Sequence, residues 1–304
     1  MSYKVSVIIP TYKRGINLVK RAIESVLLQD YENIEIIVVD DNAKEELLQY
    51  RVEIENYIIT LNNEKIIYLK NQKNLGGSLA RNEGIKIATG QYITFLDDDD
   101  MYLERKITNQ LEFMINNKLD MCFTDVKICD ENNKVVDYRD YSNIKKYDKE
   151  SLIKYHLTRH ITPTNGFMYK TDVIKKIGMF PDAIMGQEFY LMYNTIEADI
   201  KIGYSQKCNF IMYRYKNDNS ITTGPNKIPG EKMLYEFKKS NFHKLSFKEK
   251  IFVRFRHHIV LAVTYKREKK IILSIKESIL AFLNSPIDSF IEFFSFQNRK
   301  KINS

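Results

Sequence analysis

The sequence predicts an α/β protein built on a mostly parallel sheet flanked by helices, followed by a C-terminal helical appendage. Over residues 1–100, short runs of β-branched and aromatic residues alternate with segments of helical spacing. Polar or acidic residues follow directly after three of these runs. Residues 225–304 instead carry apolar stripes at helical spacing and a large excess of positive charge.

The first hundred residues contain four predicted strands that are nearly continuous in apolar character, as expected of strands buried in a parallel sheet. They are Val5–Pro10, Ile34–Asp40, Lys65–Leu69 and Gln91–Leu96. Helical spacing appears between them, at Ile16–Leu27 and Leu79–Ile87. Because ligands of such sheets bind beyond the carboxyl ends of the strands, we expect three segments to converge on one site. These segments are Pro10-Thr11-Tyr12, Asp40-Asp41-Asn42 and Asp97–Asp100.

Beyond residue 101 the predicted elements are mixed. The pattern favours a helix over 103–116, strands over 121–128, 135–138 and 167–170, a short helix ending at Gly178, a helix over 188–198, and strands over 201–204 and 208–215. Asn217–Gly230 is rich in turn residues and predicts a loop and a boundary. The sequence therefore divides into a nucleotide-binding half (1–100), an acceptor half (101–224) and a basic helical region (225–304).

Composition narrows the class of protein. The three cysteines, Cys122, Cys129 and Cys208, show no metal-binding spacing and fit a reducing cytoplasm better than a disulfide framework. The N-terminus lacks the pattern of a signal peptide, and no apolar run approaches the roughly 18–20 residues that cross a bilayer. We expect a cytoplasmic protein, or one on the inner face of the plasma membrane.

Four consecutive aspartates, Asp97–Asp100, follow the fourth strand, and their repulsion must be offset by a cation or by hydrogen-bond donors. Oxygen-only ligands favour a hard divalent ion, Mn²⁺ or Mg²⁺. The alternative is a solvated turn that caps the helix near Leu103. An EF-hand is disfavoured because the required glycine and closing glutamate are missing.

Asp40-Asp41 sits at the end of the second strand, where a carboxylate can accept a hydrogen bond from a base or a ribose hydroxyl. Simple capping of a following helix by Asp41 or Asn42 is the alternative. Neither GxGxxG nor GxxxxGK[ST] occurs, which removes the main support for dinucleotide and P-loop folds.

Four ordered blocks together resemble family 2 glycosyltransferases of the GT-A fold, over about the first 220 residues. The blocks are Val5–Tyr12, Ile36–Asn42, Asn74–Asn82 and Gly90–Asp100. The resemblance implies that Pro10, Thr11 and Tyr12 frame the nucleotide base, that Asp41 pairs with the base, and that Arg81 supports this region. It also implies that Asp97-Asp98-Asp99 is the DxD motif, with Asp99 as the metal ligand and Asp97 or Asp98 at the ribose or the metal shell.

Two further segments match the family less closely. The family pattern Glu-Asp, whose Asp is the general base, appears as Gln187-Glu188, so the resemblance assigns the base to Glu188. A first-turn acid favoured by the helix dipole is the alternative. Arg214 and Lys216 match a basic loop that closes over the diphosphate, although the family often has His where this chain has Lys216. Solvated surface charge is the alternative there.

The resemblance implies an inverting transferase that moves a sugar from a nucleotide-sugar donor, a UDP-sugar by family expectation, to a glycan or lipid-linked acceptor in cell-surface polysaccharide synthesis. A non-catalytic sugar-nucleotide sensor and a nucleotidyltransferase are the rival functions.

The basic region, 225–304, holds 17 Lys and Arg against 7 Asp and Glu, whereas the rest of the chain is close to neutral. This charge favours an anionic membrane surface as partner. A helical hairpin packed on the catalytic domain or in a homodimer is the alternative. Nucleic acid is ranked last, because the acidic strand ends would repel a polyanion.

Overall fold

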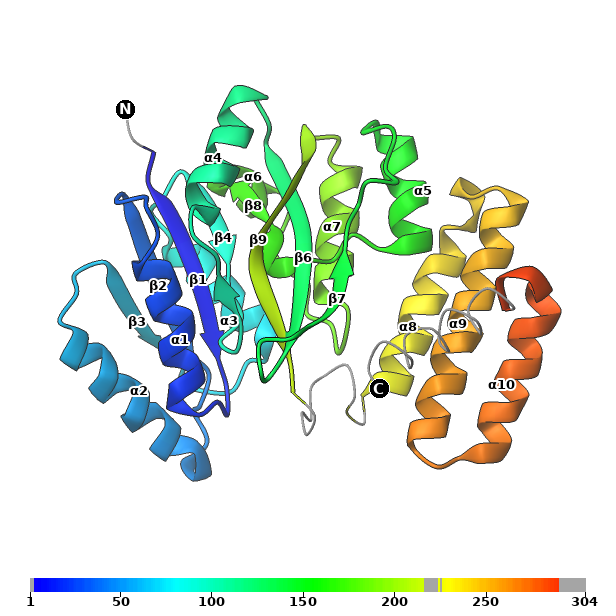
Figure 1. Cartoon of the computed structure of the whole chain (residues 1–304), viewed down its shortest axis with the longest axis horizontal. Helices are drawn as coiled ribbons and strands as arrows, with labels where there is room; N and C mark the ends of the chain where they lie inside the picture. The colour runs from blue at the N-terminus through cyan, green and yellow to red at the C-terminus, as the bar shows by residue number, and fades with distance from the viewer. Residues whose placement is uncertain (1–2, 216–223, 225, 290–304) are drawn as a thin grey trace. The chain divides into compact units, whose positions relative to one another are not determined.

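The computed structural model describes residues 3–215, 224 and 226–289. The chain forms two compact units (Figure 1). The first comprises Met1–Tyr147, Ile161–Asp182 and Gln187–Lys216, and the second comprises Asp148–His160, Ala183–Gly186 and Asn217–Ser304.

The first unit is built on one sheet, which has nine strands within the described residues, in the order β3-β2-β1-β4-β8-β6-β9-β5 with β7 paired to β6. The strands are β1 (Val5–Thr11), β2 (Ile34–Asp40), β3 (Ile66–Lys70), β4 (Tyr92–Phe95), β5 (Met101–Tyr102), β6 (Met121–Asp130), β7 (Val135–Arg139), β8 (Met168–Lys170) and β9 (Ile202–Arg214). The first four strands are parallel, as predicted. From β8 onward the sheet is mixed, and only β6 and β9 run parallel there.

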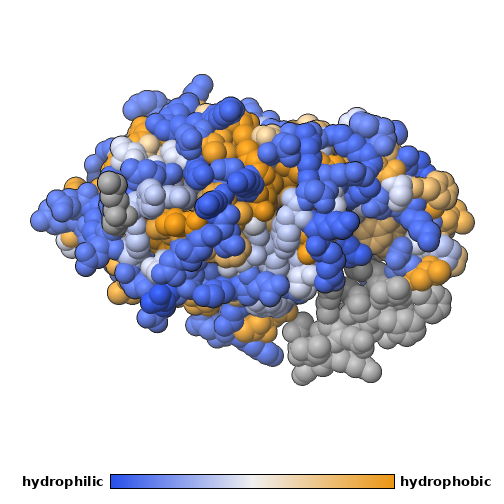
Figure 2. Space-filling view, turned by 90° about the horizontal axis from the view of Figure 1, so that it is seen from above, coloured by the Kyte–Doolittle hydropathy of each residue, from blue (hydrophilic) through white to orange (hydrophobic). Residues whose placement is uncertain are grey.

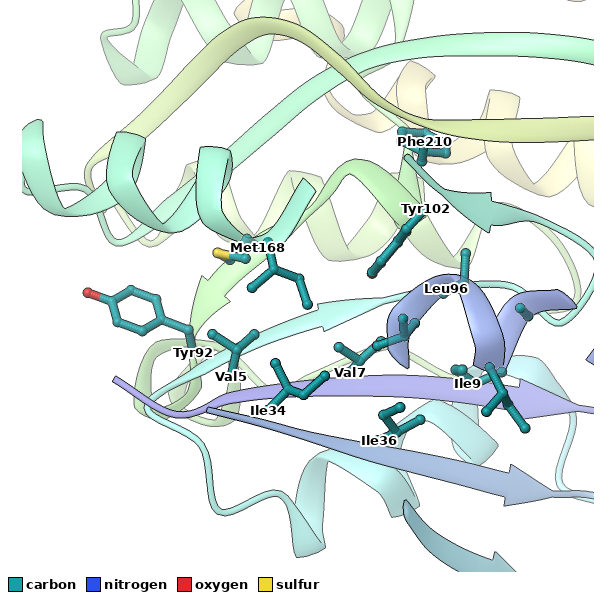
Figure 3. Packing of buried hydrophobic residues seen from close by; sticks show 14 of the residues in the cluster. Val5, Val7, Ile9, Ile34, Ile36, Tyr92, Leu96, Tyr102, Met168 and Phe210 are labelled. Atoms are coloured by element: carbon teal, nitrogen blue, oxygen red, sulfur yellow. The ribbon is translucent and has the colours of Figure 1, made fainter. Parts of the chain in front are cut away.

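Helices cover both faces of this sheet. One face packs against α1 (Ile16–Leu27), α2 (Leu48–Leu61) and α4 (Lys106–Asn116). The other face carries α3 (Gly77–Ile87), α6 (Thr171–Lys176) and α7 (Gln187–Glu197). The face seen in Figure 2 is largely hydrophilic, with separate hydrophobic patches. Many apolar side chains are instead buried in the core, where alternate residues of β1 and β2 gather with Tyr92, Met168 and Phe210 (Figure 3).

Most local predictions are confirmed, and two are wrong. The predicted strands at 201–204 and 208–215 form one strand, β9, whose pairing with β6 shifts register at Asp125. The predicted loop Asn217–Gly230 is helical from Lys227, where α8 (Lys227–Ser240) begins. Pro229 is tolerated there because the first turn of a helix needs no backbone donor. Residues 217–223 and 225 of that loop lie outside the described residues.

The second unit is helical, which agrees with the predicted appendage. It contains α5 (Lys149–Arg159), α8, α9 (Phe247–Arg267) and α10 (Ile271–Asn284). A capping box starts α9, because Glu249 N donates to Ser246 Oγ and Ser246 N donates to Glu249 Oε2. No helix in the described part of the chain is long and apolar enough to cross a membrane.

Glu35 is a buried charge that holds the strands beneath the site together. Its carboxylate accepts hydrogen bonds from Ser6 Oγ at 2.5 Å and from the backbone and hydroxyl of Thr89 at 2.7 Å, and it pairs with Lys4 Nζ at 2.7 Å. Burial raises the pKa of Glu35, but Lys4 and the hydroxyls of Ser6 and Thr89 outweigh burial and lower it from 4.5 to about 2. Glu35 therefore joins β1 and β2 to the turn that precedes β4.

Glu35→Gln should lower the free energy of unfolding at pH 7 by about 1–3 kcal/mol, because an amide cannot accept all of these hydrogen bonds. A carboxyl group whose pKa is depressed on folding stabilises fully above its unfolded pKa and loses that effect as the pH falls through its folded pKa. The difference between the two proteins should therefore shrink between pH 4.5 and about pH 2. Urea denaturation across this range measures it, with the exposed Glu64→Gln as control. A difference that is independent of pH would contradict this account.

Candidate functional site

The three polar segments predicted to converge do so at one edge of the sheet. β1 lies between β2 and β4, and all three strands run in the same direction. Thr11 is in register with Asp40, and Asp41 N donates to Thr11 O at 2.9 Å. The acidic turn follows β4 at the same edge.

The acidic turn Asp97–Asp100 is held from inside by Asn165. Asp97 N donates to Asn165 Oδ1 at 3.0 Å, and Asn165 Nδ2 donates to Asp100 Oδ2 at 2.6 Å. Tyr213 N donates to the other oxygen of Asp100 at 2.7 Å. Burial, together with the charges of Asp99 and Asp97, raises the pKa of Asp100 well above its ordinary value. Asp100 therefore fixes the turn and does not face the open site.

Two arginines neutralise the other three carboxylates. Arg14 Nε donates to Asp98 Oδ1 at 3.0 Å, and Arg14 Nη2 lies 2.8 Å from Asp99 Oδ2. Arg81 Nη2 pairs with Asp97 Oδ1. Burial raises the pKa of Asp98, and the Arg14 charge only partly offsets it. The negative charge of the turn is thus compensated by Arg14, which follows β1, and by Arg81 on α3.

Arg21 on α1 ties the turn to the end of β9. Its guanidinium donates to Asp99 O and, at 2.9 Å, to Tyr215 Oη, and it lies 3.9 Å from the centroid of the Tyr213 ring. The backbone of Asp99 is therefore anchored to the segment that leads into residues 216–223.

Asp97 and Asp99 are the candidates for a metal ion, because their side chains are 35% and 16% exposed, whereas Asp98 and Asp100 are buried. Within the described residues, no group of three or more His, Cys, Asp or Glu side chains is arranged as a metal cage. An ion such as Mg²⁺ needs only one or two carboxylates when phosphates complete its shell, so Asp97 and Asp99 fit it. A cation at Asp99 would replace Arg14 as the counter-charge.

The Asp41 carboxylate is saturated by the segment 71–76. It accepts hydrogen bonds from the side-chain amides of Asn71 and Asn74, both at 2.7 Å. It also accepts from Leu75 N at 2.9 Å and from Gly76 N at 2.8 Å. Gly76 has a φ of 79°, a conformation that glycine adopts without strain. Asp41 therefore shapes the loop that precedes α3, and α3 carries Arg81.

Arg81 also brings the start of α7 to the acidic turn. Its Nη1 donates to Gln187 Oε1 at 3.2 Å and to Gly77 O at 3.1 Å. Glu188 follows Gln187 in the first turn of α7 and is half-buried. Arg81 contacts both Asp97 and Gln187, and Glu188, the predicted base, is the residue after Gln187.

The other predicted residues are distributed as follows. Pro10 is half-buried, Thr11 is buried and Tyr12 is exposed, all at the end of β1. Arg214 ends β9 with an exposed side chain 3.9 Å from the Asp137 carboxylate. Lys216 lies outside the described residues. The roles assigned to these residues stay predictions.

Sequence reasoning missed Arg14, Arg21 and Asn165, and it named Gln187 without assigning it a contact in the site. Arg14 could have been found, because it lies two residues beyond the predicted segment Pro10-Thr11-Tyr12. The contacts of the others join residues that are between 65 and 194 positions apart. No local pattern indicates such pairs.

Known proteins resemble this chain in sequence and in fold. The model of glycosyl transferase family 2 matches residues 6–178. An uncharacterized glycosyltransferase of Methanocaldococcus jannaschii is 29% identical over 225 residues, which cover 72% of this chain and 73% of that protein. The Escherichia coli protein WfgD, named a UDP-Glc:α-D-GlcNAc-diphosphoundecaprenol β-1,3-glucosyltransferase, is 26% identical over 72% of this chain and 79% of its own length.

Other relatives are longer. An uncharacterized glycosyltransferase of Rickettsia bellii is 34% identical over 74% of this chain, but the match spans only 30% of that protein.

Among solved structures, TarS of S. aureus in complex with UDP-GlcNAc superposes with a TM-score of 0.60 at 16% identity, over 93% of this chain and 92% of that one. At this identity the likeness shows a common fold, the GT-A fold.

Asp41→Asn should lower the free energy of unfolding by about 2 kcal/mol without any nucleotide, because the new NH₂ group would face N–H donors of the 71–76 segment. Urea denaturation of the unliganded protein measures this. Asp199→Asn is the control, since Asp199 is exposed and its φ of 53° suits asparagine. Unchanged stability would mean that Asp41 does not hold the loop and would leave base contact as its function.

Proposed function

This chain belongs to glycosyl transferase family 2, and from that premise we propose that it moves a sugar from a UDP-sugar to a hydroxyl of a glycan or lipid-linked acceptor, with inversion at the anomeric carbon. The observation that carries the proposal is the meeting of the acidic turn with the start of α7, through Arg81. Donor phosphates at the turn and an acceptor hydroxyl at Glu188 would then lie within one site.

The names of similar proteins support the donor and the acceptor. WfgD is named for a UDP-glucose donor and for an acceptor linked to diphosphoundecaprenol, and TarS crystallised with UDP-GlcNAc. We propose the same classes of donor and acceptor here. Family membership favours sugar transfer over nucleotidyl transfer and over binding without catalysis.

Divalent metal ions are general among glycosyltransferases of this fold, and we propose Mn²⁺ or Mg²⁺ at Asp99, with Asp97 or Asp98 at the ribose or in the shell of the ion. Such an ion, when bound, neutralises the charge that develops on the leaving diphosphate. Arg14 Nη2, which lies 2.8 Å from Asp99 Oδ2, would then face the donor phosphates while Arg14 Nε keeps its contact with Asp98.

In the proposed reaction, the acceptor oxygen attacks C1 of the donor sugar from the face opposite the diphosphate. The new C1–O bond forms as the old one breaks, and the diphosphate leaves with the electron pair. Glu188 takes the proton of the acceptor hydroxyl. The first turn of α7 suits this role, because a helix N-terminus stabilises a carboxylate and keeps it ready to accept a proton.

Glu188→Gln should reduce kcat by about 10²–10⁴, because a positioned general base contributes that factor, while the Kd for UDP stays unchanged. Transfer to a synthetic polyprenyl-diphosphate sugar measures kcat, and titration calorimetry measures Kd. Glu197→Gln, at the other end of α7, is the matched control. Near-normal turnover in Glu188→Gln would remove Glu188 as the base.

Asp99→Asn should weaken UDP binding about tenfold or more in the presence of Mn²⁺, and much less in its absence, because the variant loses a carboxylate ligand of the ion. Calorimetric titrations with and without Mn²⁺ measure both effects, with Asp199→Asn again as control. Equal weakening in both conditions would show that Asp99 acts without a metal.

A further inference from the structure

Helix α10 of the second unit packs against α9 through its polar and small residues. Ser274 Oγ donates to Ala262 O at 2.9 Å, and Glu277 Oε2 lies 2.6 Å from His258 Nδ1. Ala281 is buried, and Ser274 and Glu277 are half-buried. Positions 274, 277 and 281 recur at helical spacing, so together they form the inward side of α10.

The opposite side of α10 is apolar and exposed. The stripe consists of Ile272, Ile275, Ile279, Phe282 and Leu283, whose exposed fractions run from 49% to 85%. Their spacing of three and four places them on one face of the helix. A helix of a water-soluble protein normally buries such a face, whereas α10 turns its polar side inward. Contiguous exposed apolar surface of this kind marks an interaction site.

Lysines lie at one end of this stripe and on the helix that carries it. Lys269 and Lys270 immediately precede α10, Lys270 pairing with Glu268 at 2.7 Å, and Lys276 is exposed on the helix itself. Residues 225–304 hold 17 Lys and Arg against 7 Asp and Glu. A partner of the stripe must therefore combine an apolar interior with a negatively charged rim, and an anionic lipid bilayer has both.

We propose that the stripe on α10 inserts into the interfacial region of an anionic bilayer, with Lys269, Lys270 and Lys276 at the level of the headgroups. A symmetric pair of copies joined through the same stripe would bring together Lys276 of both copies, and like charges repel each other. Lipid headgroups instead supply the opposite charge. The proposal does not depend on the transfer reaction or on the roles of Asp99 and Glu188.

Vesicle flotation of the full-length protein tests the proposal. The protein should float with vesicles rich in phosphatidylglycerol and much less with pure phosphatidylcholine, and high salt should release it because screening weakens the lysine contacts. The double variant Ile275→Gln/Ile279→Gln should bind about tenfold to a hundredfold more weakly, because two aliphatic side chains no longer enter the bilayer. Its thermal unfolding should be unchanged, since neither residue is buried.

Val52→Gln/Ile59→Gln is the matched control, because these two aliphatic residues are similarly exposed but lie on α2 of the first unit. It should bind vesicles as the unchanged protein does. Lys269→Gln/Lys270→Gln should weaken binding to the anionic vesicles and leave the low phosphatidylcholine binding as it is.

Three results would overturn the proposal. In the first, the unchanged protein ignores anionic vesicles, and light scattering shows a dimer that Ile275→Gln/Ile279→Gln converts to a monomer. In the second, the stripe variant floats as well as the unchanged protein. In the third, Phe293→Gln/Phe294→Gln abolishes flotation while the stripe variant retains it, which would assign the membrane contact to the terminal segment and not to α10.

Discussion

Four adjacent carboxylates can share one turn only if the charge of each is compensated, and this requirement organises the site. Arg14 compensates Asp98 and Asp99, Arg81 compensates Asp97, and Asp100 is satisfied by donors from Asn165 and Tyr213. These partners come from the segment after β1, from α3, from the turn before β8 and from β9. Neutralising the turn therefore joins elements from both halves of the sheet, since parts of each meet at the same four residues.

The sequence predicted that the three polar segments meet at one edge of the sheet, as they do, but it did not predict the contacts among their side chains. Apolar strands followed by polar residues are a local pattern, and the topology of parallel sheets converts that pattern into a position at one edge. Asp41 was predicted at that edge, yet its hydrogen bonds to Asn71, Asn74, Leu75 and Gly76 depend on the path of a loop. In the mixed half of the sheet β5 was missed, because a strand of two residues carries no periodic signal, whereas β8 was predicted.

The structure gives a physical reason for glutamine at position 187 of the pair Gln187-Glu188. Gln187 accepts a hydrogen bond from Arg81, the same guanidinium that pairs with Asp97. A carboxylate at position 187 would compete with Asp97 for that cation, whereas the neutral amide accepts the hydrogen bond without adding a fifth negative charge to the site. The departure from the family pattern at this position thus suits a site that already holds four aspartates.

Helix α10 shows that the spacing of apolar residues predicts a helix and its apolar face but not what that face contacts. Its apolar stripe was visible in the sequence, but a stripe alone does not say whether the core or another partner receives it. The face of α10 that points inward is determined by Ser274 and Glu277, which contact Ala262 and His258 of α9. Because the inward contacts of α10 are polar, the apolar side has to face outward. The partners on α9 therefore set the orientation of α10, and hydrophobicity determines what its remaining face can bind.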